Sequence, residues 1–175
     1  LWWLIVAAWL VATIETRSYG LYFQTRIGRK GKRFLVIKIK TMYHAKEISN
    51  NITTSNDPRI TKSGHLFRSS KIDELPQLWN VLIGNMSFVG PRPDVAGYAD
   101  KLRGSDRIIL TVRPGITGPA SLKYKNEESL LSDQIDPIKY NDDVIWPDKV
   151  KINIDYICNY KFSKDIRFIC QTFVS

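Results

Sequence analysis

The first segment of the sequence is apolar and uncharged, and it constrains the fold more than any other part of the chain. Leu1 to Ile14 contains three tryptophans and no charged residue. As a helix it is roughly 21 Å long, shorter than the roughly 30 Å hydrocarbon core of a bilayer. Three placements stay open: the end of a spanning helix, one arm of a re-entrant helix, or a buried helix of a soluble protein. The tryptophans favour a membrane interface.

A basic stretch follows directly. Arg17 to Lys46 contains nine Lys and Arg residues and no acidic residue, and the whole chain has a formal charge of +9. Such a charge implies an anionic partner. An apolar segment followed by a basic one is typical of a membrane segment beside a surface that faces anionic lipid, and a solvated basic face is the alternative. No nucleic-acid-binding module is recognisable, so no nucleic-acid partner is expected.

The next part of the chain predicts a β-hairpin. Gly20–Ile27 and Phe34–Lys40 have the composition of strands, and Gly28 to Gly31 supplies a basic turn between them. This turn either contacts lipid headgroups or is a solvated loop. The polar segment from His44 to Pro58 predicts a loop.

The remainder of the chain is predicted to be mainly helical, which gives an α+β fold class. Asp136-Pro137 and Trp146-Pro147 predict breaks. Cys158 and Cys170 fit no zinc pattern, and we expect them to be reduced residues of a core or an interface. The predicted helices are Ile60–Ser70 with a cap at Ser63, Asp73–Ile83, Val95–Leu110, Asn126–Asp136, Lys149–Asn159 and the amphipathic Asp165–Phe173.

The stretch from Arg68 to Pro93 carries the candidate chemistry. It contains the acidic pair Asp73-Glu74, which follows Arg68 and precedes Arg92, an arginine held between two prolines. Asp73 has a plain structural interpretation as the N-cap of the next helix. A helix start with guanidinium groups nearby is also a natural anion site, where a carboxylate can share a divalent ion with a phosphate.

Common nucleotide-binding and hydrolase motifs are missing from the sequence. It has no Walker A loop, no G-x-G-x-x-G, no G-x-S-x-G and no H-E-x-x-H. Arg113, which precedes Pro114-Gly115, repeats the arrangement of a rigid backbone beside an arginine. The residues alone therefore indicate a membrane-associated, phosphate-binding protein.

Three motifs resemble the bacterial sugar transferase family, the monotopic phosphoglycosyl transferases that begin lipid-linked glycan assembly. They are Gly20 to Met42, the run from Asp73 to Pro93 that includes Met86-Ser-Phe-Val-Gly-Pro-Arg-Pro93, and Arg113 to Gly118. The resemblance implies transfer of a sugar-1-phosphate from a nucleotide-diphosphate sugar, usually a UDP-sugar, to undecaprenyl phosphate, with release of UMP. It covers essentially the whole chain.

The resemblance also implies roles for individual residues. Asp73 matches the nucleophile that forms a covalent phosphosugar intermediate, and Glu74 matches its partner. Both residues are expected to bind a Mg²⁺ cofactor. Arg68 and Arg92 match phosphate-holding positions. The remaining substrate-binding candidates are Lys40 and, in a loop tied to nucleotide binding, Arg113, Gly115 and Thr117. Asp155-Tyr156 matches a family position to which no role is assigned.

For the membrane, the resemblance implies that residues 1–16 are the returning arm of a re-entrant helix whose first arm lies upstream, and that residues 17–175 form a catalytic domain on the cytoplasmic face of the bacterial inner membrane. Interfacial amphipathic helices are expected there. The alternative function is a non-catalytic peripheral membrane protein that binds anionic lipid. The sugar and the oligomeric state stay open.

Overall fold

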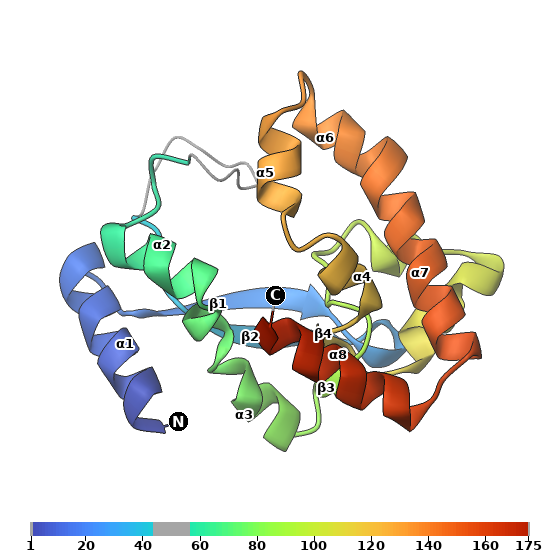
Figure 1. The fold of residues 1–175 in the computed structure, drawn as a ribbon, viewed down its shortest axis with the longest axis horizontal. Helices are drawn as coiled ribbons and strands as arrows, with labels where there is room; N and C mark the ends of the chain where they lie inside the picture. The colour runs from blue at the N-terminus through green and yellow to red at the C-terminus, as the bar shows by residue number, and fades with distance from the viewer. Residues whose placement is uncertain (1, 44–56, 175) are drawn as a thin grey trace.

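The computed structural model describes residues 2–43 and 57–174, so the predicted loop His44–Pro58 lies almost wholly outside the described residues. The described part has a mixed α+β architecture, mostly helical, with two small two-stranded sheets. This confirms the predicted fold class. A β-hairpin crosses the molecule, with helix α1 at one end and helix α7 at the other (Figure 1).

Helix α1 (Trp2–Thr16) packs on the hairpin and on α2 (Lys62–Ser69). Its buried stripe is Ala8 and Ala12, which contact Ile39 and Phe67. Gly20 lies close beneath the helix, because a Cβ there would be 2.4 Å from the carbonyl oxygen of Trp9. Among the described residues, no helix combines the length and the apolar character that crossing a membrane requires.

The predicted hairpin is confirmed. Strand β1 (Leu21–Ile27) pairs antiparallel with β2 (Arg33–Ile39), in the register Leu21↔Ile39. The turn between them contains the short 3₁₀ segment η1 (Arg29–Gly31), in which Lys30 and Gly31 have φ values of 60° and 72°. Two successive residues in the left-handed region reverse the chain sharply, as hairpin turns require.

Two details of the predicted helices Ile60–Ser70 and Asp73–Ile83 are wrong. The cap of α2 is Thr61, whose hydroxyl oxygen accepts a hydrogen bond from the Gly64 amide at 2.9 Å. Ser63 instead hydrogen-bonds the side chain of Glu15. The second helix is split into the 3₁₀ turn η2 (Ile72–Glu74) and α3 (Gln77–Leu82). Lys71, at φ 58°, ends the preceding helix and forces this turn.

The predicted rigid loop from Arg113 to Pro119 contains a short strand. Strand β4 (Gly115–Thr117) pairs parallel with β3 (Ser87–Val89). The pairing continues past β3, where the Gly115 amide donates to the Pro91 carbonyl and the Gly90 amide to the Thr117 carbonyl, both at 2.9 Å. Gly115 is required at this seam, because a Cβ there would lie 2.2 Å from the Gly90 nitrogen.

A continuous helix over Val95–Leu110 is not formed. The segment holds two 3₁₀ stretches instead, η3 (Ala99–Lys101) and η4 (Gly104–Thr111). Gly97 and Gly104 interrupt it with φ values of 108° and 57°, which no α-helix contains. The two stretches nevertheless contribute to the core, where Ala99 and Leu110 contact Ile27.

The carboxyl-terminal half is helical, as predicted, but the break at Trp146-Pro147 is absent. The π-turn η5 leads directly into α7, and Pro147 lies in the first turn of that helix, where its missing N–H group costs little. Cys158 and Cys170 are free and exposed, so they are not core residues. The elements are α4 (Pro119–Lys123), α5 (Glu127–Ser132, shorter than predicted), α6 (Pro137–Tyr140), η5 (Asn141–Ile145), α7 (Trp146–Cys158) and α8 (Phe162–Val174).

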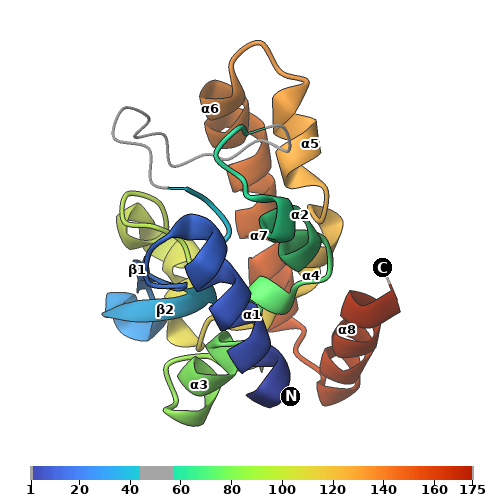
Figure 2. The ribbon, with the colours of Figure 1, turned by 90° about the vertical axis from the view of Figure 1, so that its left-hand side faces the viewer.

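Three elements far apart in the sequence lie at the same end of the molecule. The start of α1, helix α3 and helix α8 lie at the opposite end from α5 and α6 in both views (Figures 1 and 2). We call this surface the apolar end, because large apolar side chains are exposed on all three elements. They are Trp2, Trp3, Trp79, Leu82, Ile83, Phe162 and Ile166.

Candidate active site

The acidic pair lies in the short turn η2, between α2 and α3. The left-handed conformation of Lys71 redirects the chain so that both carboxylates point inward, and only 8% of Asp73 and 9% of Glu74 are exposed. Neither residue caps a helix with its side chain, so the interpretation of Asp73 as an N-cap is wrong. The turn therefore buries two neighbouring carboxylates, which is costly unless other groups compensate their charge.

Glu74 is compensated by two cations from distant segments. Lys38 on β2 places its Nζ 3.1 Å from Oε1, and Arg92, in the loop after β3, hydrogen-bonds both carboxylate oxygens. Burial alone would raise the pKa of Glu74, but the positive charges of Arg92 and Lys38 outweigh it and hold that pKa well below its usual range. Glu74 is thus a fixed anion that joins the hairpin to the Pro-Arg-Pro loop.

Asp73 has no such compensation. Its Oδ1 is buried without a hydrogen-bond partner among the described residues. Burial, together with the negative charge of Glu74, raises the pKa of Asp73 to about 6, against the smaller opposing effects of Lys38, Lys71 and Arg68. An unpaired carboxylate next to a paired one can serve as a nucleophile or a metal ligand without first breaking an ion pair.

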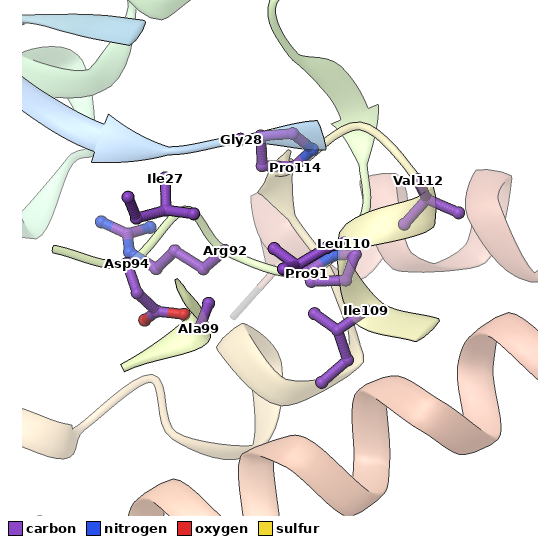
Figure 3. Close-up of a pocket in the computed structure, with 10 residues that line it drawn as sticks. All are labelled: Ile27, Gly28, Pro91, Arg92, Asp94, Ala99, Ile109, Leu110, Val112 and Pro114. Carbon is purple, nitrogen blue, oxygen red and sulfur yellow. The ribbon is translucent and has the colours of Figure 1, made fainter. Parts of the chain in front are cut away.

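A further carboxyl group, Asp94, extends the site beyond Arg92. Burial raises the pKa of Asp94 to about 6, although Lys149, Arg26 and Arg92 oppose this rise. Figure 3 shows the Asp94 carboxylate near the Arg92 side chain in a small pocket below Ile27. That cavity measures about 10 Å³, room for roughly one water molecule, so it cannot hold a substrate.

Arg92 is therefore set between two acidic groups, Glu74 and Asp94, and its backbone is restrained by prolines on both sides. On the far side of the loop, Arg26 on β1 donates to the Pro93 carbonyl at 3.2 Å. Sequence reasoning missed Lys38, Arg26 and Asp94. For Lys38 a signal existed: it lies two residues before the predicted Lys40, on the same face of the strand.

The other predicted substrate residues form no hydrogen bond or ion pair with Asp73 or Glu74 in the described part of the chain. Arg68, in the last turn of α2, pairs with Glu128 of α5, and Lys40 donates to the Ser18 hydroxyl at 2.7 Å. Arg113 lies beside Gly84 at the end of α3. The Thr117 hydroxyl bonds that of Thr172 on α8 at 2.7 Å, and Gly115 closes the seam between β3 and β4. Their predicted roles in substrate binding stay predictions.

A comparison with protein-family models decides the relationship. The model described as bacterial sugar transferase matches residues 1–175, which is the whole sequence. The chain belongs to the bacterial sugar transferase family. The predicted family is thereby confirmed.

Several curated bacterial sugar transferases are about one third identical to the chain. The uncharacterized sugar transferase EpsL of Bacillus subtilis is 33% identical over 93% of this chain and 72% of its own. A UDP-glucose:undecaprenyl-phosphate glucose-1-phosphate transferase of Caulobacter vibrioides is 32% identical over 97% of this chain and 61% of its own. A UDP-galactose-lipid carrier transferase of Erwinia amylovora is 30% identical over 87% of this chain and 32% of its own. The chain thus spans less than two thirds of the last two relatives.

Residues Asp73 and Glu74 fit the magnesium ion that membership of the sugar transferase family implies. The described residues contain no group of three or more His, Cys, Asp or Glu side chains placed to hold a metal alone. Magnesium is usually bound through one or two carboxylates together with substrate phosphates, and the unpaired Oδ1 of Asp73 suits such a shared site. Both carboxylate oxygens of Glu74 are hydrogen-bonded to Arg92, so a Glu74 that binds a metal would have to interact with the metal and with Arg92 at once.

Tyr156 has a structural role in this sugar transferase. Its hydroxyl donates to Asp165 at 2.7 Å, and its ring contacts that of Phe168, which joins α7 to α8. Asp155 is exposed and accepts a hydrogen bond from Asn159 at 2.8 Å. Tyr156 thus links α7 to α8, whereas Asp155 bonds only the end of its own helix.

The uncompensated burial of Asp73 predicts that Asp73→Asn stabilises the protein at pH 7.5. A folded-state pKa of about 6 against an ordinary value of 3.8 means that ionised Asp73 destabilises the fold above pH 6. We expect a gain of about 1–3 kcal/mol at pH 7.5, measured by thermal unfolding in detergent with EDTA. The gain should shrink as the pH falls from 6 and vanish below 3.8, where the wild-type carboxyl is neutral in both states. An unchanged or lower stability at pH 7.5 would contradict this account.

The opposite effect is expected for Glu74→Gln. The substitution removes a buried anion from Lys38, which is 21% exposed, and from Arg92, which is 43% exposed, so the free energy of unfolding should fall by about 1–3 kcal/mol. Glu128→Gln is the matched control, because Glu128 is 45% exposed and its pair with Arg68 should contribute less than about 1 kcal/mol. Equal losses in the two variants would show that Glu74 does not organise the site.

Proposed function

We propose that the chain transfers a sugar-1-phosphate from a UDP-sugar to undecaprenyl phosphate and releases UMP. The observation that carries this proposal is the buried, unpaired carboxylate of Asp73 beside the cation-bound Glu74. The names of the Caulobacter and Erwinia relatives support the substrate class, since they specify UDP-sugar donors and, in the first case, an undecaprenyl phosphate acceptor. Which sugar is transferred depends on contacts that these names do not define.

The first step is attack of the Asp73 carboxylate on the β-phosphorus of the donor. A bond forms between a carboxylate oxygen and phosphorus, and the bond from the β-phosphorus to the bridging oxygen breaks. UMP leaves with that electron pair, and the sugar phosphate stays on Asp73 as an acyl phosphodiester. No proton is needed, because the attacking group is already an anion above its pKa of about 6.

The second step returns Asp73 to its starting state. A phosphate oxygen of the lipid attacks the same phosphorus, and the bond to the carboxylate breaks. The product is a lipid diphosphate sugar, and the carboxylate is free for another cycle. With two displacements of this kind, UMP leaves before the lipid phosphate attacks, so donor and acceptor need not occupy the site together.

The surrounding cations support a place for the phosphates beside Asp73. Arg92 is held by Glu74 and restrained by two prolines, so it is oriented before substrate arrives. Arg68 contributes positive potential at Asp73 and must leave Glu128 to contact a phosphate directly. A magnesium ion held by Asp73 and Glu74 with the diphosphate would neutralise charge that develops on the leaving UMP.

The apolar end agrees with a membrane acceptor. Undecaprenyl phosphate has a very long apolar chain, so its phosphate is available only at the membrane surface. The exposed tryptophans of α1 and α3 suit an interface, and α8 adds Phe162 and Ile166. We infer that this end lies on the cytoplasmic face of the inner membrane.

Asp73→Asn should abolish turnover. The full-length protein, undecaprenyl phosphate, Mg²⁺ and a panel of UDP-sugars are combined, and UMP is measured. The wild type should release UMP with at least one donor and, without acceptor, should gain the mass of one sugar phosphate on Asp73. The variant should do neither, because an amide is a poor nucleophile toward phosphorus.

Asp143→Asn is the matched control, since Asp143 is exposed at the far end of the molecule, and it should retain wild-type activity. The alternative function, non-catalytic binding of anionic lipid, makes the opposite prediction. A wild-type protein that binds vesicles but releases no UMP with any donor would establish that alternative.

A further inference from the structure

A second concentration of positive charge lies away from Asp73 and Glu74, at the turn of the β-hairpin. It forms a pocket of about 370 Å³ between the turn, the end of α3 and the segment before β4. Phe34, Gly84 and Asn85 supply the neutral part of its lining. No acidic side chain of the described residues lines it, and the cations that do are Arg29, Lys30, Lys32, Arg33 and Arg113.

Most of these cations are not engaged within the protein. Arg29 donates to the Thr111 carbonyl at 2.8 Å, which attaches the turn to η4. The side chains of Lys30, Lys32 and Arg33 form no hydrogen bond or ion pair with any residue of 2–43 or 57–174. Like charges held this close repel each other, so the pocket favours an anion with several oxygen acceptors, which is the chemistry of a phosphate group.

The pocket is too far from Asp73 to hold a phosphate that reacts there. Lys38, which bonds Glu74, and Arg33, which lines the pocket, are separated by five residues of strand β2, or roughly 17 Å at 3.3 Å per residue. The only phosphates of a UDP-sugar are the two that must lie at Asp73. A phosphate in this pocket therefore belongs to another molecule.

The surroundings of the pocket indicate what that molecule is. Asn80 on α3 bonds the β2 backbone through the Leu35 carbonyl at 2.7 Å and the Ile37 amide at 3.2 Å, which directs the end of α3 toward the hairpin turn. Leu82 and Ile83, 78% and 53% exposed, directly precede the lining residues Gly84 and Asn85. A cationic pocket thus adjoins the apolar end.

We propose that this pocket binds the phosphate headgroup of an anionic membrane phospholipid, whose acyl chains lie along Leu82 and Ile83. The proposal rests on the proposed function, both for the membrane location and for the place of the donor phosphates at Asp73. Binding there would fix the rotation of the protein on the membrane, with the hairpin turn pressed against the headgroup layer.

The test uses the full-length protein and vesicles, without donor or acceptor. Binding to phosphatidylcholine vesicles is compared with binding to vesicles that contain 30% phosphatidylglycerol, a composition chosen as the probe. The test variant is Lys32→Gln/Arg33→Gln, and the control is Lys125→Gln/Lys151→Gln, which removes the same charge from exposed positions that do not line the pocket. The test variant should lose most of the gain from phosphatidylglycerol, about fivefold for each cation removed, whereas the control should lose less than twofold.

Further arms separate the possible sources of phosphate. Inorganic phosphate or UDP at 5 mM should leave the difference between the two variants intact at constant ionic strength, and displacement by either would overturn the lipid assignment. Equal losses in the two variants would also overturn it, by showing a diffuse charge effect. Because no turnover is measured, these outcomes are independent of whether the chain releases UMP.

Discussion

The structure depends on one carboxylate, that of Glu74, and on the two cations that bind it. Lys38 comes from the hairpin and Arg92 from the loop after β3, so a single anion fixes two segments around the turn that carries Asp73. Burying one carboxylate with two cations is electrostatically sound, but burying a second carboxylate beside it is not. The imbalance falls on Asp73, which is left without a hydrogen-bond partner for Oδ1 and with a raised pKa. The reactivity that we propose for Asp73 is thus a direct consequence of how Glu74 is stabilised.

Much of the fold could be predicted from local sequence, and the failures have identifiable causes. The hairpin followed from strand-forming residues on both sides of a Gly-containing turn. The helices over Asp73–Ile83 and Val95–Leu110 were wrong because backbone conformations with positive φ, at Lys71, Gly97 and Gly104, interrupt them. A lysine gives no local sign that it will adopt such a conformation. The missing break at Trp146-Pro147 is different, since a proline is compatible with both a helix start and a helix end.

The sequence predicted what kind of site the chain contains, but only some of the residues that form it. Asp73, Glu74 and Arg92 are close in sequence and form one motif, whereas Lys38, Arg26 and Asp94 reach the site through the tertiary fold. Charge alone could not distinguish Lys38 from Lys40, because the predicted strand Phe34–Lys40 places both on the same face. Their separation along the strand decides which of them meets Glu74. The apolar end likewise contains side chains from three elements. Of these, only the segments that form α1 and α8 were predicted from the sequence to lie at a membrane.

Close backbone pairing around Gly90 and Gly115, between β3 and β4, joins the loop that carries Arg92 to the loop that carries Arg113. Pro91, next to Arg92, accepts the amide of Gly115, and Arg113 lies two residues before that glycine. Because no side chain separates the backbones at Gly90 and Gly115, the two segments are in direct contact and move together. A displacement of Arg113 is therefore transmitted through the paired backbones to Arg92. If the proposed membrane location holds, contact of Arg113 with a bilayer would in this way shift Arg92 without any helix having to move.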